Sequence, residues 1–247
     1  MSEPTSTARV ALVTGASGGI GRAVARRLAA DGDAVAVHYS GNRGAAEKLV
    51  AELTEAGGRA IAVGGDVADE TAMATAFDAV ESEFGGLDVV VNSAGIMLLG
   101  RVADFDLADL DRMHRTNIRG TFVLSQLAAR RLRPGGAIIN LSTSQVRIQS
   151  PTYGAYIASK AAVEGLTLVL ARELGGRDIT VNTVAPGPVE TPLFLNGANQ
   201  ATIDRLTQNT PLGRLGRPTD VADVVSFLAG PGRWVNGQVL YANGGIA

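Results

Sequence analysis

The sequence predicts an α/β fold in which a doubly wound parallel sheet of seven strands carries helices on both faces. Short apolar runs alternate with segments of helical periodicity almost to the end of the chain, as in a parallel sheet that helices cover on both sides. A glycine-rich stretch directly follows the first apolar run, where a doubly wound sheet binds phosphates. No linker interrupts the chain, so we expect residues 1–247 to form a single domain.

The first apolar run and the glycines behind it predict a strand, a loop and a helix. Residues 10–13 suit a strand buried on both faces, and Ile20, Val24 and Leu28 then recur at helical spacing. Glycines let the backbone turn sharply here and bring an anion against the free N–H groups that begin the helix. The four glycines are Gly15, Gly18, Gly19 and Gly21. We therefore predict a diphosphate site at this turn.

The glycine spacing alone leaves the ligand open. It matches neither the G-x-G-x-x-G dinucleotide fingerprint nor the G-x-x-x-x-G-K-[ST] nucleotide loop. Ile20 follows Gly19 where the nucleotide loop requires lysine, which disfavours a kinase or an NTPase. A tight turn without any ligand is the simpler alternative, so the choice between the two depends on motifs elsewhere in the chain.

The alternation of strand and helix continues through the first half of the chain. Each predicted strand is an apolar run, and each predicted helix has apolar residues one turn apart and a Gly-Gly pair at its end. The strands are residues 34–39, 59–63 and 87–91. The helices are residues 45–56, which contain Leu49 and Leu53, and residues 73–84, which contain Met73, Phe77, Val80 and Phe84.

The second half has longer helices and one polar segment. We predict helices at residues 106–132, 153–175 and 221–228, and strands at residues 137–141, 179–184 and 238–241. Residues 191–209 are polar and contain glycine, with weak helical signal, so we expect a mobile substrate flap there. An eight-stranded barrel is the competing fold, but seven strands fall short of it.

Composition narrows the class of function. Apolar residues make up 46% and charged residues 19% of the chain, and the net charge of −2 argues against a general nucleic-acid binder. The chain has no cysteine and only two histidines, His38 and His114, so we expect no metal site. Residues 1–8 are polar and no run approaches the roughly 18 apolar residues of a membrane span, so we expect a cytoplasmic protein without membrane contact.

Several motifs in fixed order resemble those of the short-chain dehydrogenase/reductase family over nearly the full length. The segment from Thr14 to Gly21 resembles its T-G-x-x-x-G-x-G cofactor loop, and residues 92–95, Asn-Ser-Ala-Gly, match its N-N-A-G in all but one position. Residues in the positions of its catalytic tetrad are Asn117, Ser142, Tyr156 and Lys160. Within the family the chain looks most like bacterial 3-oxoacyl-carrier-protein reductases and trihydroxynaphthalene-reductase-like members. The resemblance implies a Rossmann-type fold and NADP(H)-linked reduction of a ketone.

The Tyr156 and Lys160 pair also makes chemical sense by itself. Reducing a carbonyl needs a proton on oxygen, and a phenol supplies it if its pKa can be lowered. On the predicted helix the two residues are four apart and share a face, and an ammonium near a phenol favours the phenolate. This chain has twenty arginines and only two lysines, so a lysine here is a selective choice. The competing phenol, Tyr153, has no lysine four residues on.

The hydroxyl for the substrate carbonyl is less clearly defined by sequence. Ser142, Thr143 and Ser144 precede Tyr156 by fourteen, thirteen and twelve residues, and family members differ between thirteen and fourteen. We choose Ser142, because Pro151 also fits the fourteen-residue form. The resemblance implies that Asn117 supports Lys160 through water.

The resemblance also implies a set of cofactor-binding residues. An NAD enzyme of this architecture places an acidic residue near the end of the second strand, whereas this chain has Tyr39, Ser40 and Arg43 there, which favours NADP(H). Gly18 departs from several NADP-linked relatives, which carry arginine at that place. The expected cofactor contacts are Gly15, Ser17, Gly19, Ile20, Tyr39, Ser40, Arg43, Asp66, Val67, Asn92, Ala94, Gly95, Tyr156, Lys160, Pro186, Gly187, Val189 and Thr191.

Two other function classes stay open. The alternative is a regulatory protein of the same fold that binds NADP(H) without turnover, but an intact Tyr156 and Lys160 argue against it. An epimerase or dehydratase is a weaker alternative, since we expect no further substrate domain after residue 241. The substrate is a small carbonyl compound or alcohol that the sequence does not name; nothing in it supports an acyl carrier protein as partner.

We expect a homo-oligomer, a tetramer by resemblance, with helices 106–132 and 153–175 at an interface. Two pairs of small residues, Ala128-Ala129 and Ala161-Ala162, permit close approach of these helices.

Overall fold

The computed structural model describes residues 8–196 and 199–247, and its centre is a parallel sheet of seven strands. The strand order is β3-β2-β1-β4-β5-β6-β7, and all six pairings are parallel. The strands are β1 (Val10–Thr14), β2 (Ala34–Tyr39), β3 (Ala60–Gly64), β4 (Val89–Asn92), β5 (Ala137–Leu141), β6 (Thr180–Pro186) and β7 (Val239–Ala242). The predicted fold class is confirmed, and each predicted strand lies within two residues of its observed bounds.

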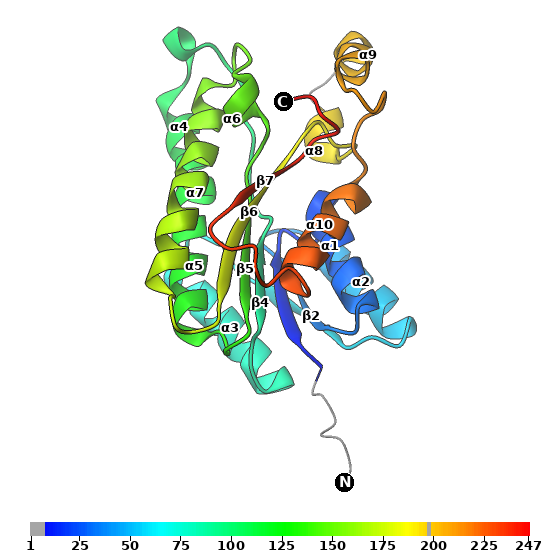
Figure 1. Ribbon diagram of the computed structural model, residues 1–247, viewed down its shortest axis with the longest axis vertical. Coiled ribbons are helices and arrows are strands. Elements are labelled where there is room, and N and C mark those ends of the chain that lie inside the picture. Colours follow the sequence, from blue (N-terminus) through cyan, green and yellow to red (C-terminus); the bar gives the residue numbers. More distant parts are fainter. Residues whose placement is uncertain (1–7, 197–198) are drawn as a thin grey trace.

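Helices cover both faces of this sheet (Figure 1). One face is covered by α1 (Gly19–Ala30), α2 (Arg43–Glu55) and α10 (Pro218–Ala229), whose apolar residues share a core with β1, β2 and β5. The opposite face is covered by α3 (Glu70–Phe84), α5 (Gly120–Arg131) and α7 (Gly154–Glu173), which share a second core. The inner strands β1, β2, β4 and β5 are buried on both faces, and their sequences are therefore mostly apolar, whereas the edge strands β3 and β7 are only partly buried.

The order of strands reverses between β1 and β4. The chain adds β2 and β3 on one side of β1, then returns to place β4 on the other side, with Thr14 opposite Asn92. The loops that follow these two strands therefore leave in opposite directions and open a crevice at the carboxyl edge of the sheet. Ligands of open α/β sheets bind in such a crevice.

The helix predicted at residues 106–132 is confirmed as one helical segment, but a π-helical turn that was not predicted lies within it. The structure has α4 (Leu107–His114), a π-helical turn η2 (Arg115–Arg119) and then α5. Periodicity did not reveal the interruption, because a π-turn inserts only a local change of hydrogen bonding into an otherwise helical segment. Such turns frequently mark functional sites, and this one contains Asn117.

Short helices also occur in segments for which none was predicted. The expected flap, residues 191–209, contains α8 (Pro192–Leu195) and α9 (Gln200–Asn209), and residues 197–198 within it lie outside the described part. Thr191 and Asn199 cap these two helices, and local capping of this kind leaves little trace in apolar periodicity. The mobility of this segment stays a prediction. The 3₁₀ turn η1 (Val102–Asp104) and α6 (Gln145–Ile148) are also additions.

Within the described residues, α7 alone is long and apolar enough to cross a membrane. In the structure it packs against β5 and β6 and buries Lys160. Of the polar N-terminal segment that we predicted at residues 1–8, residues 1–7 lie outside the described part.

His38, on β2, is a titratable side chain inside this fold. It is 1% exposed, and its Nε2 lies 3.0 Å from the carbonyl oxygen of Gly65. Burial lowers the pKa of His38 from 6.5 to about 4, although Gly65 and Asp66 act in the opposite direction. Between about pH 4 and pH 6.5 the His38 ring is therefore neutral in the folded protein and protonated in the unfolded chain.

We expect the free energy of unfolding to fall as the pH drops from about 6.5 to about 4, because the unfolded state then binds a proton at His38 that the folded state does not. A shift of this size corresponds to about 3 kcal/mol. Urea unfolding of the parent and of His38→Gln at pH 7, 6, 5 and 4.5 measures this loss, which the variant should lack. Equal pH dependence in the two proteins would contradict it.

Candidate active site

The turn between β1 and α1 depends on glycine. A Cβ atom on Gly21 would lie 2.6 Å from the carbonyl oxygen of Gly15, and one on Gly15 would lie 3.0 Å from the backbone of Ala94. No side chain caps the start of α1 at Gly18, and its first turn holds no acidic residue. Its N–H groups therefore remain free for an anion, as phosphate binding at a helix N-terminus requires.

Thr14 ties this turn to the end of β4. Its Oγ1 accepts hydrogen bonds from the backbone N–H groups of Ser93 and Ala94, at 3.2 and 3.1 Å, and lies 3.2 Å from Oδ1 of Asn92. Asn92 in turn donates to Thr121 on α5 over 2.7 Å. Asn92 is therefore a buried support beneath the crevice.

A cavity of about 500 Å³ runs from the glycine turn to α7. Its wall includes ten of the predicted cofactor residues: Gly15, Ser17, Gly19, Ile20, Ala94, Gly95, Tyr156, Lys160, Pro186 and Thr191. It combines a bare helix N-terminus, glycine backbone and one buried lysine, which fits the diphosphate and sugar of a dinucleotide. Gly187 and Val189 line an adjoining pocket instead.

The remaining predicted contacts lie outside this cavity, beyond the ends of β2 and β3. The ring of Tyr39 packs over Gly64, where an added Cβ would lie 2.9 Å from it. Arg43 begins α2 with a 74% exposed side chain and donates to Glu47 over 2.7 Å. Asp66 accepts from the N–H of Ala68 and pairs with Arg115, and the first of these contacts is the larger cause of its lowered pKa.

Residues Ser40 and Val67 complete this outer group. Ser40 follows β2 directly, and Val67 is 3% exposed against Gly120.

Helix α7 brings Tyr156 and Lys160 to the inner end of the cavity. Both side chains are buried, at 8% and 6% exposure, and Nζ of Lys160 donates to the carbonyl oxygen of Leu141 over 2.8 Å. Burial raises the pKa of Tyr156, and it lowers the pKa of Lys160 to about 8. The lowered phenol pKa that we expected from Lys160 is thus absent in the protein alone, because burial dominates and Lys160 is not among the groups that act on the phenol.

Asn117 is fully buried in the π-turn η2. Its side chain donates to the carbonyl of Ile96 and accepts from the N–H of the same residue, each over 2.9 Å, and also donates to Oγ of Ser159 over 3.0 Å. A Cβ on Gly95 would lie 3.2 Å from Oδ1 of Asn117 and 3.3 Å from Nζ of Lys160. Asn117 therefore holds the loop after β4 beside Lys160.

The three neighbouring hydroxyls after β5 have three different partners. Ser142 donates to Oε1 of Glu164 on α7 over 2.6 Å, and Ser144 donates to the carbonyl of Ala185 on β6 over 3.2 Å. Thr143 is the hydroxyl within reach of the Tyr156 phenol, where it lowers the phenol pKa against the effect of burial. Ser142 lines both the cofactor cavity and the adjoining pocket, and Thr143 lines the pocket, so the choice of Ser142 for the substrate carbonyl stays a prediction.

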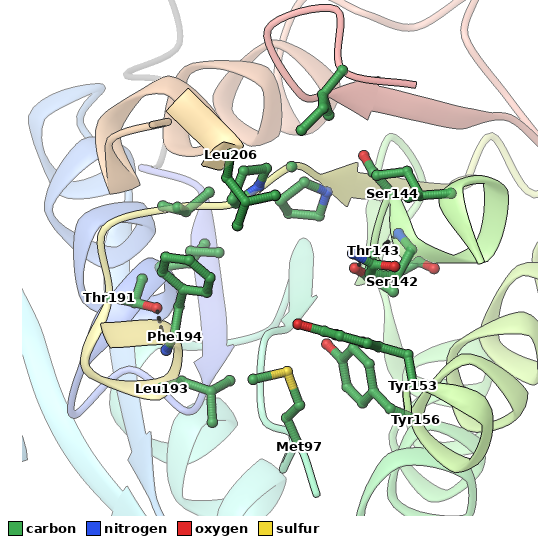
Figure 2. A pocket seen from close by; sticks show the side chains of 18 residues that line it. Met97, Ser142, Thr143, Ser144, Tyr153, Tyr156, Thr191, Leu193, Phe194 and Leu206 are labelled. Atoms are coloured by element: carbon green, nitrogen blue, oxygen red, sulfur yellow. Dashed lines mark hydrogen bonds between the residues drawn. The ribbon is translucent and has the colours of Figure 1, made fainter. Parts of the chain in front are cut away.

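An apolar pocket adjoins the cavity at Tyr156 (Figure 2). The phenol groups of Tyr153 and Tyr156 both point into it, their ring centres lie 6.5 Å apart, and Met97, Leu193 and Phe194 face them. None of the described residues in its lining carries a charged side chain. Sequence reasoning missed Leu206 and Ile246, which join it from distant segments.

Comparisons with known proteins show which family the chain resembles. Residues 15–247 match a family model described as "Enoyl-(Acyl carrier protein) reductase". A "Short-chain type dehydrogenase/reductase" of Picea abies is 45% identical, with 96% of this chain and 92% of the relative covered. An "NADPH-dependent aldehyde reductase-like protein, chloroplastic" of Arabidopsis thaliana is 42% identical, with coverage of 96% and 93%.

A solved structure is equally similar. The crystal structure of a short-chain dehydrogenase from Burkholderia cenocepacia J2315 in complex with NADP is 42% identical, has a TM-score of 0.91 and matches 96% of this chain and 97% of its own. The glycine turn, the paired Tyr156 and Lys160 and these similarities together show that the chain belongs to the short-chain dehydrogenase/reductase family.

Proposed function

We propose that this protein is an NADP(H)-dependent oxidoreductase that transfers hydride between the nicotinamide and a ketone or secondary alcohol. The observation that carries the proposal is that Tyr156 and Ser142 line both the cofactor cavity and the apolar pocket, with the Thr143 hydroxyl beside the phenol. A regulatory protein without turnover has no need of such a pair. The bound cofactor supplies the hydride and positive charge near the phenol.

In this proposal each residue has a distinct role. Tyr156 donates the proton to the carbonyl oxygen during reduction and accepts it during oxidation. Thr143 accepts a hydrogen bond from the backbone N–H of Gln145 over 3.2 Å, which leaves its own hydrogen for the carbonyl oxygen. Lys160, with its pKa lowered to about 8 by burial, binds the cofactor sugar and favours the phenolate when protonated. Asn117 supports the loop beside it.

The apolar pocket favours an uncharged carbonyl compound with an aryl or alkyl group as substrate. Charged substrates have no partner among its described residues, and leaving an ion unpaired in an apolar pocket is costly. We also propose that residues 1–247 act as one oxidoreductase domain and that segment 191–209 closes over the substrate, because Leu193, Phe194 and Leu206 line this pocket. A cytoplasmic location stays a prediction.

Tyr156→Phe should lower turnover by about 100-fold or more, because general acid catalysis is lost while the ring still packs. Turnover is measured as NADPH consumption at 340 nm with uncharged aryl and alkyl ketones. The same assay with keto acids of matched size tests the pocket, and the parent should turn over the uncharged ketones faster. NADPH binding, followed by fluorescence, should persist in the variant. Tyr153→Phe is the matched control and should stay within several-fold of the parent; near-parental turnover in Tyr156→Phe would exclude it as the proton donor.

Arg43→Ala should raise KM for NADPH by about tenfold, the effect of losing roughly 1.4 kcal/mol of phosphate binding. KM for NADH should hardly change, because NADH lacks the 2′-phosphate. Steady-state kinetics with both cofactors gives KM for NADPH and KM for NADH in the parent and in the variant. Glu47→Gln is the control: it removes the present partner of Arg43 and should leave NADPH binding intact or stronger. Equal losses with NADPH and NADH would refute this role.

We further propose a homotetramer with α5 and α7 at an interface. Phe122, Leu168 and Val169 are exposed apolar residues on these helices, at 58%, 44% and 51%. Ala161 and Ala162 are exposed as a close helix contact requires, whereas Ala128 is buried in the protein's own core, so that part of the sequence argument was wrong.

Sedimentation at micromolar concentration should give the mass of four chains, and Val169→Asp should reduce it, because a charge in an apolar interface is not compensated. A parent that sediments only as monomer would contradict the assembly.

A further inference from the structure

Helix α7 contacts the end of β5 at three successive turns. Tyr156, Lys160 and Glu164 are four residues apart and lie on one helix face. Their partners are consecutive in sequence: the side chain of Thr143, the carbonyl oxygen of Leu141 and the hydroxyl of Ser142. The proposed catalytic chemistry uses the first two contacts and leaves the third without a role.

The third contact is a short hydrogen bond between Ser142 and Glu164. The Oγ of Ser142 donates to Oε1 of Glu164 over 2.6 Å, and Ser142 is 5% exposed. A hydroxyl that donates to a carboxylate forms a short, charge-assisted bond, about twice as strong as one between neutral groups. On its other side the backbone N–H of Ser142 donates to the carbonyl of Val184 on β6 over 2.8 Å. Ser142 is therefore fixed between α7 and β6.

The position of Ser142 determines that of its neighbours. Thr143 follows Ser142 directly and lines the substrate pocket with it, so a shift of Ser142 also moves the Thr143 hydroxyl. The peptide before Ser142 carries the Leu141 carbonyl that accepts from Lys160. A displacement of roughly 1 Å at a reacting group can cost about 100-fold in rate.

We infer that Glu164 is a positioning residue: its carboxylate holds Ser142 and thereby places the Thr143 hydroxyl and the Leu141 carbonyl relative to Tyr156 and Lys160. The inference rests on the proposed carbonyl chemistry of this site. Glu164 acts as a hydrogen-bond acceptor, and its charge is not required. It acts through Ser142 alone, so the two residues form one unit.

Kinetics of Ser142→Ala, Glu164→Ala and the double variant test this unit. Each single change should lower kcat by about tenfold while KM for NADPH stays within about twofold, because cofactor contacts are kept. The kcat of the double variant should be no lower than that of the slower single variant, because both changes remove the same hydrogen bond. Glu164→Gln should stay within about threefold of the parent, because its amide oxygen still accepts from Ser142. Glu173→Ala, an exposed glutamate on the same helix, is the matched control.

Three results would overturn the inference. The first is a loss of kcat in the double variant equal to the product of the two single losses, and the second is a kcat of Glu164→Gln as low as that of Glu164→Ala. The third is an unchanged kcat in both single variants. Thermal unfolding of each variant identifies those that fail to fold, and Glu164→Leu, which keeps bulk without an acceptor, replaces Glu164→Ala in that case. A parent without carbonyl turnover would refute the proposed function instead, so the two failures are distinguishable.

Discussion

The parallel pairing of β1 with β4 is the constraint on which the site depends. It sets Thr14 opposite Asn92 at the carboxyl edge of the sheet, where the Thr14 hydroxyl accepts from both residues that follow β4. The glycine turn and the loop after β4 thereby form the two walls of one crevice. Because ligands of open α/β sheets bind at such a reversal of strand order, the cofactor site follows from the topology.

Burial shapes the chemistry within that crevice. Tyr156 and Lys160 are desolvated by the same packing of α7 on β5 and β6, which disfavours the charged form of each. The phenol thus remains a neutral proton donor, and the ammonium of Lys160 loses its proton more easily than in water. Polar contacts offset part of this desolvation, through the Leu141 carbonyl for Lys160 and through Thr143 for Tyr156. Tyr156 and Lys160 would therefore meet the positive charge of an oxidised nicotinamide with pKa values that burial has already shifted.

The errors of sequence reasoning have a common physical origin. The π-turn around Asn117 depends on contacts with Ile96 and Ser159, which are distant in sequence, so the periodicity of residues 106–132 contains no sign of it. Spacing also did not reveal that the Ser142 hydroxyl donates to Glu164, which lies on another element. The helices within residues 191–209 are short and capped locally, and apolar periodicity is weak in elements of that length.

The sequence by itself determined the strand–helix alternation, the glycine turn and the Tyr156 and Lys160 pair, because each arises from residues near one another in the chain. Apolar runs predict buried strands, glycine permits the turn, and a four-residue spacing puts two side chains on one helix face. Only the tertiary structure showed that Glu164 accepts a hydrogen bond from Ser142, and that Leu206 and Ile246 join the substrate pocket. These depend on how separate elements pack, and packing brings together residues whose proximity no local pattern records.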